Sequence, residues 1–295
     1  MKHLQNAPSR ALSASKPSRL VVEPIVRTAL LEDLAHGGDL TTEAIVPPEL
    51  RARARVVARK AGVIAGLDAA LLAFEVLDPG STHARILIDD GGWANADQVV
   101  AELEGPARAL LTGERTMLNL LCRLSGIATA TRALVDAVAG TRARVVDTRK
   151  TTPGLRVLEK YAVRCGGGGN HRFGLDDAIL IKDNHLALAG SIREAVARAR
   201  ERAGHTVKIE VEVDTLEQLR EALREPIDAV LLDNMTPAML AEAVRITGGA
   251  VLTEASGGVR PETIAAIAAT GVDLISVGSL THSAPALDLA LDIAL

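Results

Sequence analysis

The second half of the chain alternates short apolar segments with longer segments whose apolar residues recur at helical spacing. Nearly continuous apolar strands that alternate with helices are typical of parallel strands covered by helices. The pattern therefore predicts an α/β fold. It fits either a barrel of about six strands or a doubly wound open sheet, because spacing alone does not fix closure of the sheet. The six predicted strands are residues 144–148, 178–183, 208–213, 228–233, 251–256 and 274–279.

Helix start signals lie between several of these strands. A capping box places a short polar residue at the helix start and Glu or Gln three residues later. Proline suits the first helical position because an N–H there would have no partner in the helix. The predicted starts are Ser191 with Glu194, Asp214 with Glu217, Thr236 with Pro237, and Pro261.

The first half of the chain has a different pattern. Residues 51–60 begin with a strict alternation of Arg and Ala, which predicts a strand with one solvated face. The arginines of that face form either a basic site or simply a solvated surface. Helices over 22–34 and 67–77, with strands near 84–88 and 98–103, predict a small open sheet with helices. Pro106 then predicts the start of a helix that continues to about Val138.

These patterns divide the chain into two expected domains. Residues 21–112 form an N-terminal α/β domain, and residues 113–284 form the domain of parallel strands. Residues 285–295 are expected to pack back on the first domain. Residues 1–20 contain four basic residues and no acidic one, which fits a flexible leader or, alternatively, an organellar transit sequence.

Composition narrows the classes of partner. With one Trp, one Tyr and two Phe in 295 residues, stacking on nucleic-acid bases is not a general binding mode. The net charge of −4 shows no overall basicity, and no apolar stretch approaches the roughly 18 residues of a membrane span. Two cysteines, Cys122 and Cys165, make no disulfide framework, which fits a cytoplasmic location. Neither nucleic acid nor a membrane is an expected partner.

Charged side chains gather at the ends of the predicted strands. In parallel α/β folds the reacting groups meet at the carboxyl ends of the strands. Charges buried there are costly unless they meet partners or a ligand, so the pattern predicts a charged pocket. The strand-end groups are Asp147, Thr148, Arg149 and Lys150; Lys182, Asp183, Asn184 and His185; Glu210, Glu212 and Asp214; Asp233 and Asn234; Glu254 to Gly258; and Gly278, Ser279 and Leu280.

The segment 141–182 is basic, with nine Lys and Arg residues against four acidic ones. Four glycines, 166–169, precede Asn170, His171 and Arg172 in its middle. Glycine permits close backbone approach, and His and Arg supply donors for carboxylates. The segment therefore predicts an anion site, although the glycine run alone would also fit a flexible hinge.

Two carboxylates contrast with this basic segment. Glu212 and Asp233 end adjacent predicted strands, where they suit a hard cation such as Mg²⁺ that bridges to a polyphosphate. Ion pairs with Lys150 and Lys182 are the alternative. The loops Ser256–Gly257–Gly258 and Gly278–Ser279–Leu280 follow the last two strands, where barrels often bind phosphate through backbone amides.

Seven ordered motifs carry a resemblance to a known family, the quinolinate phosphoribosyltransferases. The motifs are GERTMLNLL (113–121), DTRKTTPGLR (147–156), GGGGNHRFGLDDAILIKDNH (166–185), VEVD (211–214), LLDN (231–234), ASGG (255–258) and VGSLTHS (277–283). The resemblance implies an N-terminal α/β sandwich, an incomplete α/β barrel of about six strands, and a homodimer with shared active sites. It also implies an enzyme that joins quinolinate to phosphoribosyl pyrophosphate with Mg²⁺, giving nicotinate mononucleotide, pyrophosphate and CO₂ on the route to NAD.

The resemblance also implies residue roles. Arg115 would reach the neighbouring subunit's pocket, and Lys150 would contact both substrates. Arg149, His171, Arg172 and Lys182 would hold the pyridine dicarboxylate, with Thr148 of the same motif also binding substrate. Glu212 and Asp233 would serve the metal and the ribose and, with Lys150 and Lys182, the catalytic step. The loops Ser256, Gly257, Gly258 and Gly278, Ser279, Leu280 would hold the 5-phosphate.

Two other functions remain open on the residues alone. A Schiff-base aldolase would use Lys150 or Lys182 as its nucleophile, and a phosphosugar-binding module would bind without turnover. His36 and His282 lie in loops beside glycine or serine, where they could contact phosphate, although capping is the expected role. Cys165 is expected to be a small buried residue and not a nucleophile.

Overall fold

The computed structural model describes residues 15–294, and its contacts divide the chain into two compact units. The first unit comprises the chain up to Thr129, Pro153–Gly166 and the segment from Pro285. The second comprises Ala130–Thr152 and Gly167–Ala284. Most of the expected leader lies outside the described residues. Arg19 and Leu20, which were expected to belong to it, already form the start of a helix.

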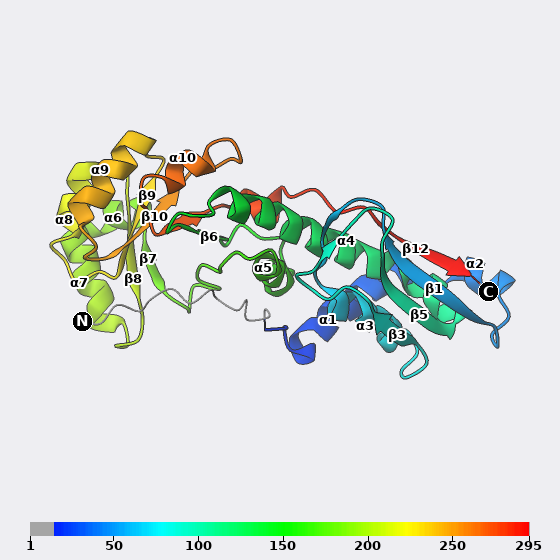
Figure 1. Ribbon diagram of the computed structural model, residues 1–295. Coiled ribbons are helices and arrows are strands. Elements are labelled where there is room, and N and C mark those ends of the chain that lie inside the picture. The colour runs from blue at the N-terminus through cyan, green and yellow to red at the C-terminus, as the bar shows by residue number, and fades with distance from the viewer. Residues whose placement is uncertain (1–14, 295) are drawn as a thin grey trace. The chain divides into compact units, whose positions relative to one another are not determined.

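The first unit is built on a four-stranded antiparallel sheet with the order β12-β1-β5-β3 (Figure 1). Helices α1 and α3 contact each other in the same unit. A short pair, β2 and β4, lies apart from the main sheet. The elements are α1 (Arg19–Leu34), α2 (Leu40–Ile45), β1 (Arg51–Ala58), β2 (Gly62–Val63), α3 (Leu67–Leu77), β3 (His83–Ile86), β4 (Trp93–Ala94), β5 (Val99–Pro106), most of α4 (Ala107–Ala137), α5 (Arg156–Cys165) and β12 (Leu289–Ala294).

Strand β1 confirms the alternation predicted from Arg and Ala. Its residues alternate between exposed and buried up to Val56, which places the arginines on the solvated face. Arg53 lies 3.2 Å from Glu104 and Arg55 lies 3.8 Å from Glu102, both acids on the neighbouring strand β5. The arginines therefore pair with acids across the sheet, and such exposed pairs contribute little stability.

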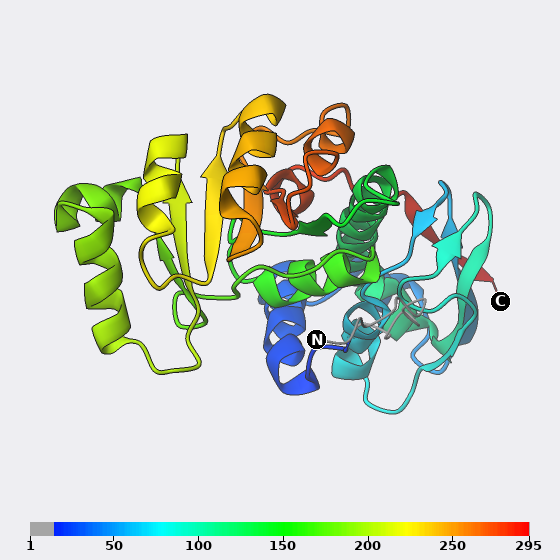
Figure 2. The same cartoon turned by 60° about the vertical axis from the view of Figure 1, so that its left-hand side comes forward.

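The second unit is built on six parallel strands with the order β6-β11-β10-β9-β8-β7 (Figure 2). This order is sequential around a circle, as in a barrel opened between β6 and β7, whereas a doubly wound sheet reverses direction in its middle. The structure therefore confirms an α/β fold with six parallel strands. The elements are β6 (Arg144–Val146), β7 (Ile179–Ile181), α6 (Asp183–Ala189), α7 (Ile192–Arg202), β8 (Ile209–Val213), α8 (Leu216–Ala222), β9 (Ala229–Asp233), α9 (Pro237–Thr247), β10 (Leu252–Ser256), α10 (Ile264–Ala268), β11 (Leu274–Ser276) and α11 (Ser279–His282).

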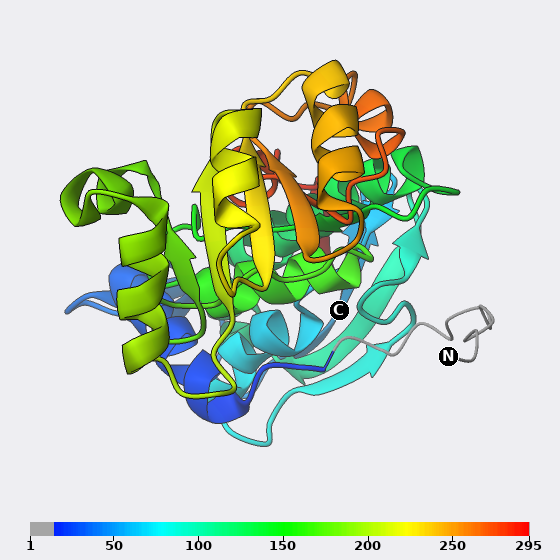
Figure 3. The same ribbon diagram turned by 90° about the vertical axis from the view of Figure 1, so that its left-hand side faces the viewer.

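Helices α7, α8, α9 and α10 follow one another along this sheet, each in contact with the next (Figure 3). Right-handed connections between sequentially ordered parallel strands place successive helices on one face. The central strands are buried, with Val211, Leu232 and Ile275 fully enclosed. The strand ends, and not the strand middles, are therefore the place where polar side chains can meet a ligand.

The helix starts are partly as predicted. Ser191 accepts the N–H of Glu194, and Thr236 caps α9 with Pro237 at its first position. The prediction for α8 is wrong by one residue: Thr215 is the cap, and Gln218 completes the box. The helix expected from Pro261 begins at Ile264.

No helix within residues 15–294 is both long enough and apolar enough to cross a membrane.

Candidate active site

A cavity of about 310 Å³ lies within the second unit, where the parallel strands end. Most of the residues predicted for the site line it. These are Thr148, Arg149, Lys150, His171, Arg172, Lys182, Glu212, Ser256, Gly257, Gly258, Gly278 and Ser279. Five separate strand ends, those of β6, β7, β8, β10 and β11, thus bring predicted residues to one place, as the strand-end pattern predicted.

Three predicted site residues do not line this cavity. Asp233 ends β9 and is half-buried. Leu280 belongs to α11, and its side chain is buried. Arg115 is exposed on α4, in the first unit. The roles predicted for these three residues stay predictions.

The turn after β6 presents Thr148, Arg149 and Lys150. The Thr148 hydroxyl accepts the N–H of Lys150 at 3.0 Å, and the Thr281 hydroxyl donates to the Lys150 carbonyl at 2.8 Å. Thr148 therefore shapes the turn, and α11 anchors the backbone that carries Lys150. Hydroxyls bonded in this way hold a turn in one conformation.

Asp147 fixes the segment that follows the glycine run. Its buried carboxylate accepts the N–H of His171 at 2.9 Å and an amide N–H of Asn170 at 2.5 Å. Gly169 pairs beside β6, where a Cβ would lie 2.9 Å from the Arg144 Nε. A larger residue here would have to displace the Arg144 side chain. The pairing of Gly169 with Val146 brings the following residues, His171 and Arg172, to the strand ends.

Two guanidinium groups in the cavity lie close enough to repel each other. Burial, and then the positive charge of Arg149, lowers the pKa of Arg172. Arg172 donates from Nη1 to the Ala178 carbonyl at 2.9 Å. The Nε of Arg149 is buried without a hydrogen-bond partner, and Arg149 makes no ion pair within residues 15–294. Two adjacent guanidinium groups, one with an unused buried N–H donor, form a site for an anion. A carboxylate bound there would offset their positive charge and accept a hydrogen bond from the unused donor.

Carboxylates occupy the opposite part of the site. Lys182 Nζ lies 3.4 Å from Glu212 Oε2. Burial raises the pKa of both Glu212 and Asp233, and the nearby charge of Asp214 further raises that of Asp233. Raised pKa values mean that Lys182 does not fully compensate the two carboxylates. An all-oxygen donor set with uncompensated negative charge fits a hard divalent cation such as Mg²⁺.

The loops after β10 and β11 complete the cavity. Gly257 has a φ of 92°, and a Cβ there would collide with the Asn234 side-chain oxygen. Only glycine fits this conformation. Ser256, Gly258 and Ser279 offer hydroxyl and backbone donors at the same loops, which suits a phosphate.

Sequence reasoning missed several residues of the cavity. For His282 a capping role was favoured over contact with phosphate, but it lines the cavity, and its Nδ1 lies 2.6 Å from the Ser283 hydroxyl. Glu254 and Ser276 also line it. No hydrophobic periodicity and no motif assigned a binding role marks His282 or Ser276 as a functional residue in the sequence. Glu210 and Glu254 were placed at predicted strand ends, but the sequence did not indicate that both contact His171.

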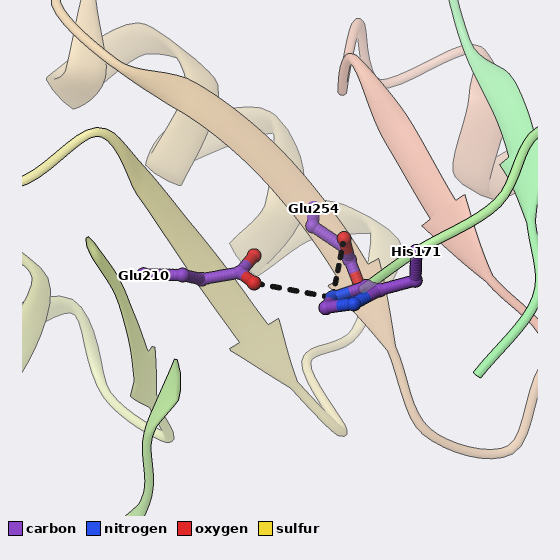
Figure 4. A group of neighbouring side chains, drawn as sticks. All are labelled: His171, Glu210 and Glu254. Atoms are coloured by element: carbon purple, nitrogen blue, oxygen red, sulfur yellow. Dashed lines mark hydrogen bonds and ion pairs between the residues drawn. The ribbon is translucent and has the colours of Figure 1, made fainter. Parts of the chain in front are cut away.

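The His171 ring lies between Glu210 and Glu254 (Figure 4). Its Nε2 is 3.1 Å from Glu210 and 3.5 Å from Glu254, and its Nδ1 accepts the Arg172 N–H at 2.7 Å. Both ring nitrogens thus have partners within the chain. Direct contact of His171 with a substrate stays a prediction.

Cys165 is free and buried, as expected, and burial raises the pKa of its thiol to about 12. A thiol held protonated in this way is a poor nucleophile.

Comparisons with known proteins agree with this geometry. The chain matches the description "Quinolinate phosphoribosyl transferase, C-terminal domain" over residues 127–292 and the N-terminal domain of the same family over residues 39–125. It is 47% identical to a probable nicotinate-nucleotide pyrophosphorylase [carboxylating] of Bacillus subtilis, covering 94% of this chain and 95% of that protein. It is 49% identical to the corresponding protein of Mycobacterium leprae, covering 91% and 95%.

A solved structure is also similar along nearly its whole length. The nicotinate-nucleotide pyrophosphorylase from Francisella tularensis superposes with a TM-score of 0.91 at 40% identity, covering 96% of this chain and 99% of that one. Together with the family descriptions, this match covers both units. The chain belongs to the quinolinate phosphoribosyl transferase family.

Proposed function

We propose that the chain transfers the phosphoribosyl group of phosphoribosyl pyrophosphate to quinolinate, with loss of CO₂. The products are nicotinate mononucleotide, pyrophosphate and CO₂, in the biosynthesis of NAD. Membership of the quinolinate phosphoribosyl transferase family supports the class of reaction. The single structural observation that supports the substrate class is the pair Arg149 and Arg172, two close guanidinium groups of which Arg149 has no acidic partner among the described residues 15–294.

The pyridine dicarboxylate is proposed to lie against Arg149, Arg172 and Lys182. Arg149 offers an unused buried Nε donor, and Arg172 has a pKa lowered by burial and by Arg149. Binding a dianion there relieves the repulsion and satisfies the donor at once. The cavity should therefore bind a substrate with two carboxylates more tightly than a substrate with one.

The ribose phosphates are proposed to lie toward the glycine loops and Lys150. Ser256, Gly258 and Ser279 supply donors for the 5-phosphate. Lys150 lines the same cavity, and its side chain lies against Gly278, where a Cβ would be 2.9 Å from the Lys150 Cδ. Glu212 and Asp233 would hold Mg²⁺, which when bound neutralises charge on the diphosphate leaving group.

The chain's own residues then act on the reaction in two ways. Positive charge develops at the ribose anomeric carbon as pyrophosphate leaves, and the carboxylates of Glu212 and Asp233 stabilise it electrostatically. The arginine pair orients the pyridine so that its nitrogen is in line with that carbon. The bond from nitrogen to carbon forms as the bond to pyrophosphate breaks. As the neighbouring carboxylate leaves as CO₂, its electron pair stays on the ring carbon as a carbanion that the adjacent positive nitrogen stabilises. A proton from Lys150 or from water then bonds to that carbon and completes nicotinate mononucleotide.

The quaternary arrangement and location are further proposals. Arg115 is proposed to enter the cavity of a second copy in a homodimer, since it is exposed on α4 and the family resemblance implies shared sites. The enzyme is proposed to work in the cytoplasm, a location supported by the two free cysteines.

The test is an assay of the purified chain with quinolinate, phosphoribosyl pyrophosphate and Mg²⁺. We expect CO₂ and nicotinate mononucleotide in equal amounts, and loss of turnover when EDTA removes the metal. Binding of phosphoribosyl pyrophosphate without turnover would instead support a phosphosugar-binding module. Irreversible labelling of Lys150 or Lys182 by borohydride with a carbonyl substrate would support the aldolase.

A further inference from the structure

Three side chains form a buried cluster at the floor of the cavity, here called the floor cluster: His171, Glu210 and Glu254 (Figure 4). Their side chains are 14%, 12% and 1% exposed. They come from the segment after the glycine run, from β8 and from β10. The floor cluster thus connects three elements that are distant in sequence, and its His171 and Glu254 line the same cavity as Arg149 and Arg172.

The hydrogen bonds of the His171 ring define its tautomer. Nδ1 accepts the backbone N–H of Arg172 at 2.7 Å, so Nδ1 carries no proton. The ring proton is therefore on Nε2, which faces Glu210 at 3.1 Å and Glu254 at 3.5 Å. A tautomer is set by the hydrogen bond that the other nitrogen makes.

The same observation argues against a metal ion in the floor cluster. One histidine and two carboxylates within 4.8 Å of one another could in principle bind a cation. A neutral histidine that binds a metal through Nε2 must carry its proton on Nδ1. Here Nδ1 is an acceptor, so the floor cluster holds a proton and not a metal.

The charge of Glu254 follows from its surroundings. Its Oε1 is buried and has no hydrogen-bond partner within residues 15–294. An anionic oxygen in that condition costs much more free energy than the oxygen of a neutral, protonated carboxyl. Burial, and then the nearby Glu210, raises the pKa of Glu254 to about 7, while His171 opposes the shift and Asp147 adds to it. Ser276 on β11 is the remaining polar side chain beside it.

We propose that Glu254 is a positioning residue of the reaction: through the His171 ring it holds the backbone of Arg172, and so sets the guanidinium that receives quinolinate. Arg172 is then held at two places. The His171 Nδ1 accepts its backbone N–H, and the Ala178 carbonyl accepts from its Nη1. Glu254 and Glu210 together keep the ring in the required tautomer. The substrate named here rests on the proposed function.

The first experiment needs no substrate. ¹⁵N chemical shifts of the His171 ring, assigned by comparison with His171→Gln, report which nitrogen carries the proton. We expect an Nε2–H imidazole with unprotonated Nδ1 in the folded wild-type chain. A proton on Nδ1 would overturn the proposal, whether or not the enzyme turns over quinolinate.

The second experiment measures kinetics of Glu254→Ala and Glu254→Gln, with Glu225→Gln as a matched control. Glu225 is a half-buried carboxylate paired with Arg193 at 3.1 Å, remote from the proposed roles. We expect Glu254→Ala to raise KM for quinolinate about tenfold while KM for phosphoribosyl pyrophosphate stays within about twofold. Glu254→Gln, which keeps a neutral acceptor for Nε2–H, restores most of the loss.

Two kinetic results contradict the proposal. Equal changes in both KM values would show a general structural effect. Equal behaviour of Gln and Ala would show that the 3.5 Å contact between Glu254 Oε2 and His171 Nε2 has no role. Should Glu254→Ala fail to fold, Glu254→Gln and the ¹⁵N measurement still decide: a ring tautomer altered by Gln, or a KM for quinolinate raised tenfold by Gln, refutes the proposed contact. A wild-type chain without quinolinate turnover would refute the proposed function instead, and leave the tautomer measurement intact.

Discussion

At the scale of residues, the site depends on charges that the chain leaves uncompensated. Arg149 has a buried Nε without a partner, and Arg172 is lowered in pKa by burial and by Arg149. Across the cavity, burial raises the pKa of Glu212 and Asp233. In the proposed function, quinolinate and Mg²⁺ would relieve these costs on binding, which is how a site stores binding energy for its ligands.

Loss of either arginine should therefore weaken the reaction strongly. Arg149→Ala and Arg172→Ala are each expected to lower kcat/KM for quinolinate about 30-fold or more. This factor corresponds to a loss of at least ~2 kcal/mol in transition-state binding, because a buried carboxylate would lose its charged donor. Steady-state kinetics of the two variants check this. Arg198→Ala, which removes an exposed arginine paired with Glu194 on α7, should change kcat/KM less than about twofold. Unchanged kcat/KM in either site variant would refute its assigned role.

At the scale of elements, the parallel strands place side chains and the helices hold the turns. The six strand positions could be predicted because buried parallel strands are continuous apolar runs, and each observed strand lies inside its predicted range. The helix α6, which begins immediately after Lys182, was not predicted. Its start is stabilised by His185, whose Nδ1 accepts the Lys182 N–H, and a histidine in that role gives no clear sequence signal.

The same limit applies to the site. Arg149, Lys150 and Lys182 could be predicted since charges at strand ends are unusual without a ligand. The floor cluster could not, because Glu210 and Glu254 lie on strands whose pairing order is a tertiary property. The box at α8 was misassigned because Asp214 and Thr215 are both good caps, and Glu217 and Gln218, each three residues later, are both good N3 partners.

The corrected cap of α8 gives a stability prediction. Thr215→Ala should lower the free energy of unfolding by about 1 kcal/mol, because the Thr215 hydroxyl accepts the Gln218 N–H at 3.2 Å. Asp214→Ala, the cap expected from sequence, should change it by less than about 0.5 kcal/mol. Urea unfolding of both variants measures the difference. A larger loss for Asp214→Ala than for Thr215→Ala would restore the original assignment.

At the scale of the whole molecule, burial links the site to stability. Burial and Glu210 raise the pKa of Glu254 from 4.5 to about 7 in the folded chain. Between those pH values the folded state retains a proton that the unfolded chain has released. The contribution of Glu254 to stability is therefore complete below pH 4.5 and is lost as pH rises through about 7.

This linkage predicts a pH-dependent difference between variants. Over that window wild type should lose stability relative to Glu254→Gln, by up to about 1.4 kcal/mol per pH unit. Urea unfolding at a series of pH values from 4 to 8 would measure the two slopes. Parallel pH profiles for wild type and Glu254→Gln would show that Glu254 titrates normally in the folded chain.

The proposed homodimer gives a prediction that no single-chain property can mimic. Arg115→Ala and Lys150→Ala should each be nearly inactive alone, but a mixture that has exchanged subunits should recover roughly one quarter of wild-type activity, because each mixed dimer contains one intact site. Activity equal to the average of the two parents would place Arg115 outside the neighbour's cavity.

Binding of quinolinate compared with nicotinate tests the cationic cavity most directly. Calorimetric titration of the wild-type chain should give a Kd for quinolinate at least about tenfold below that for nicotinate, which lacks one carboxylate, and Arg149→Ala should remove most of that difference. Equal affinities for the two acids in the wild-type chain would contradict the account.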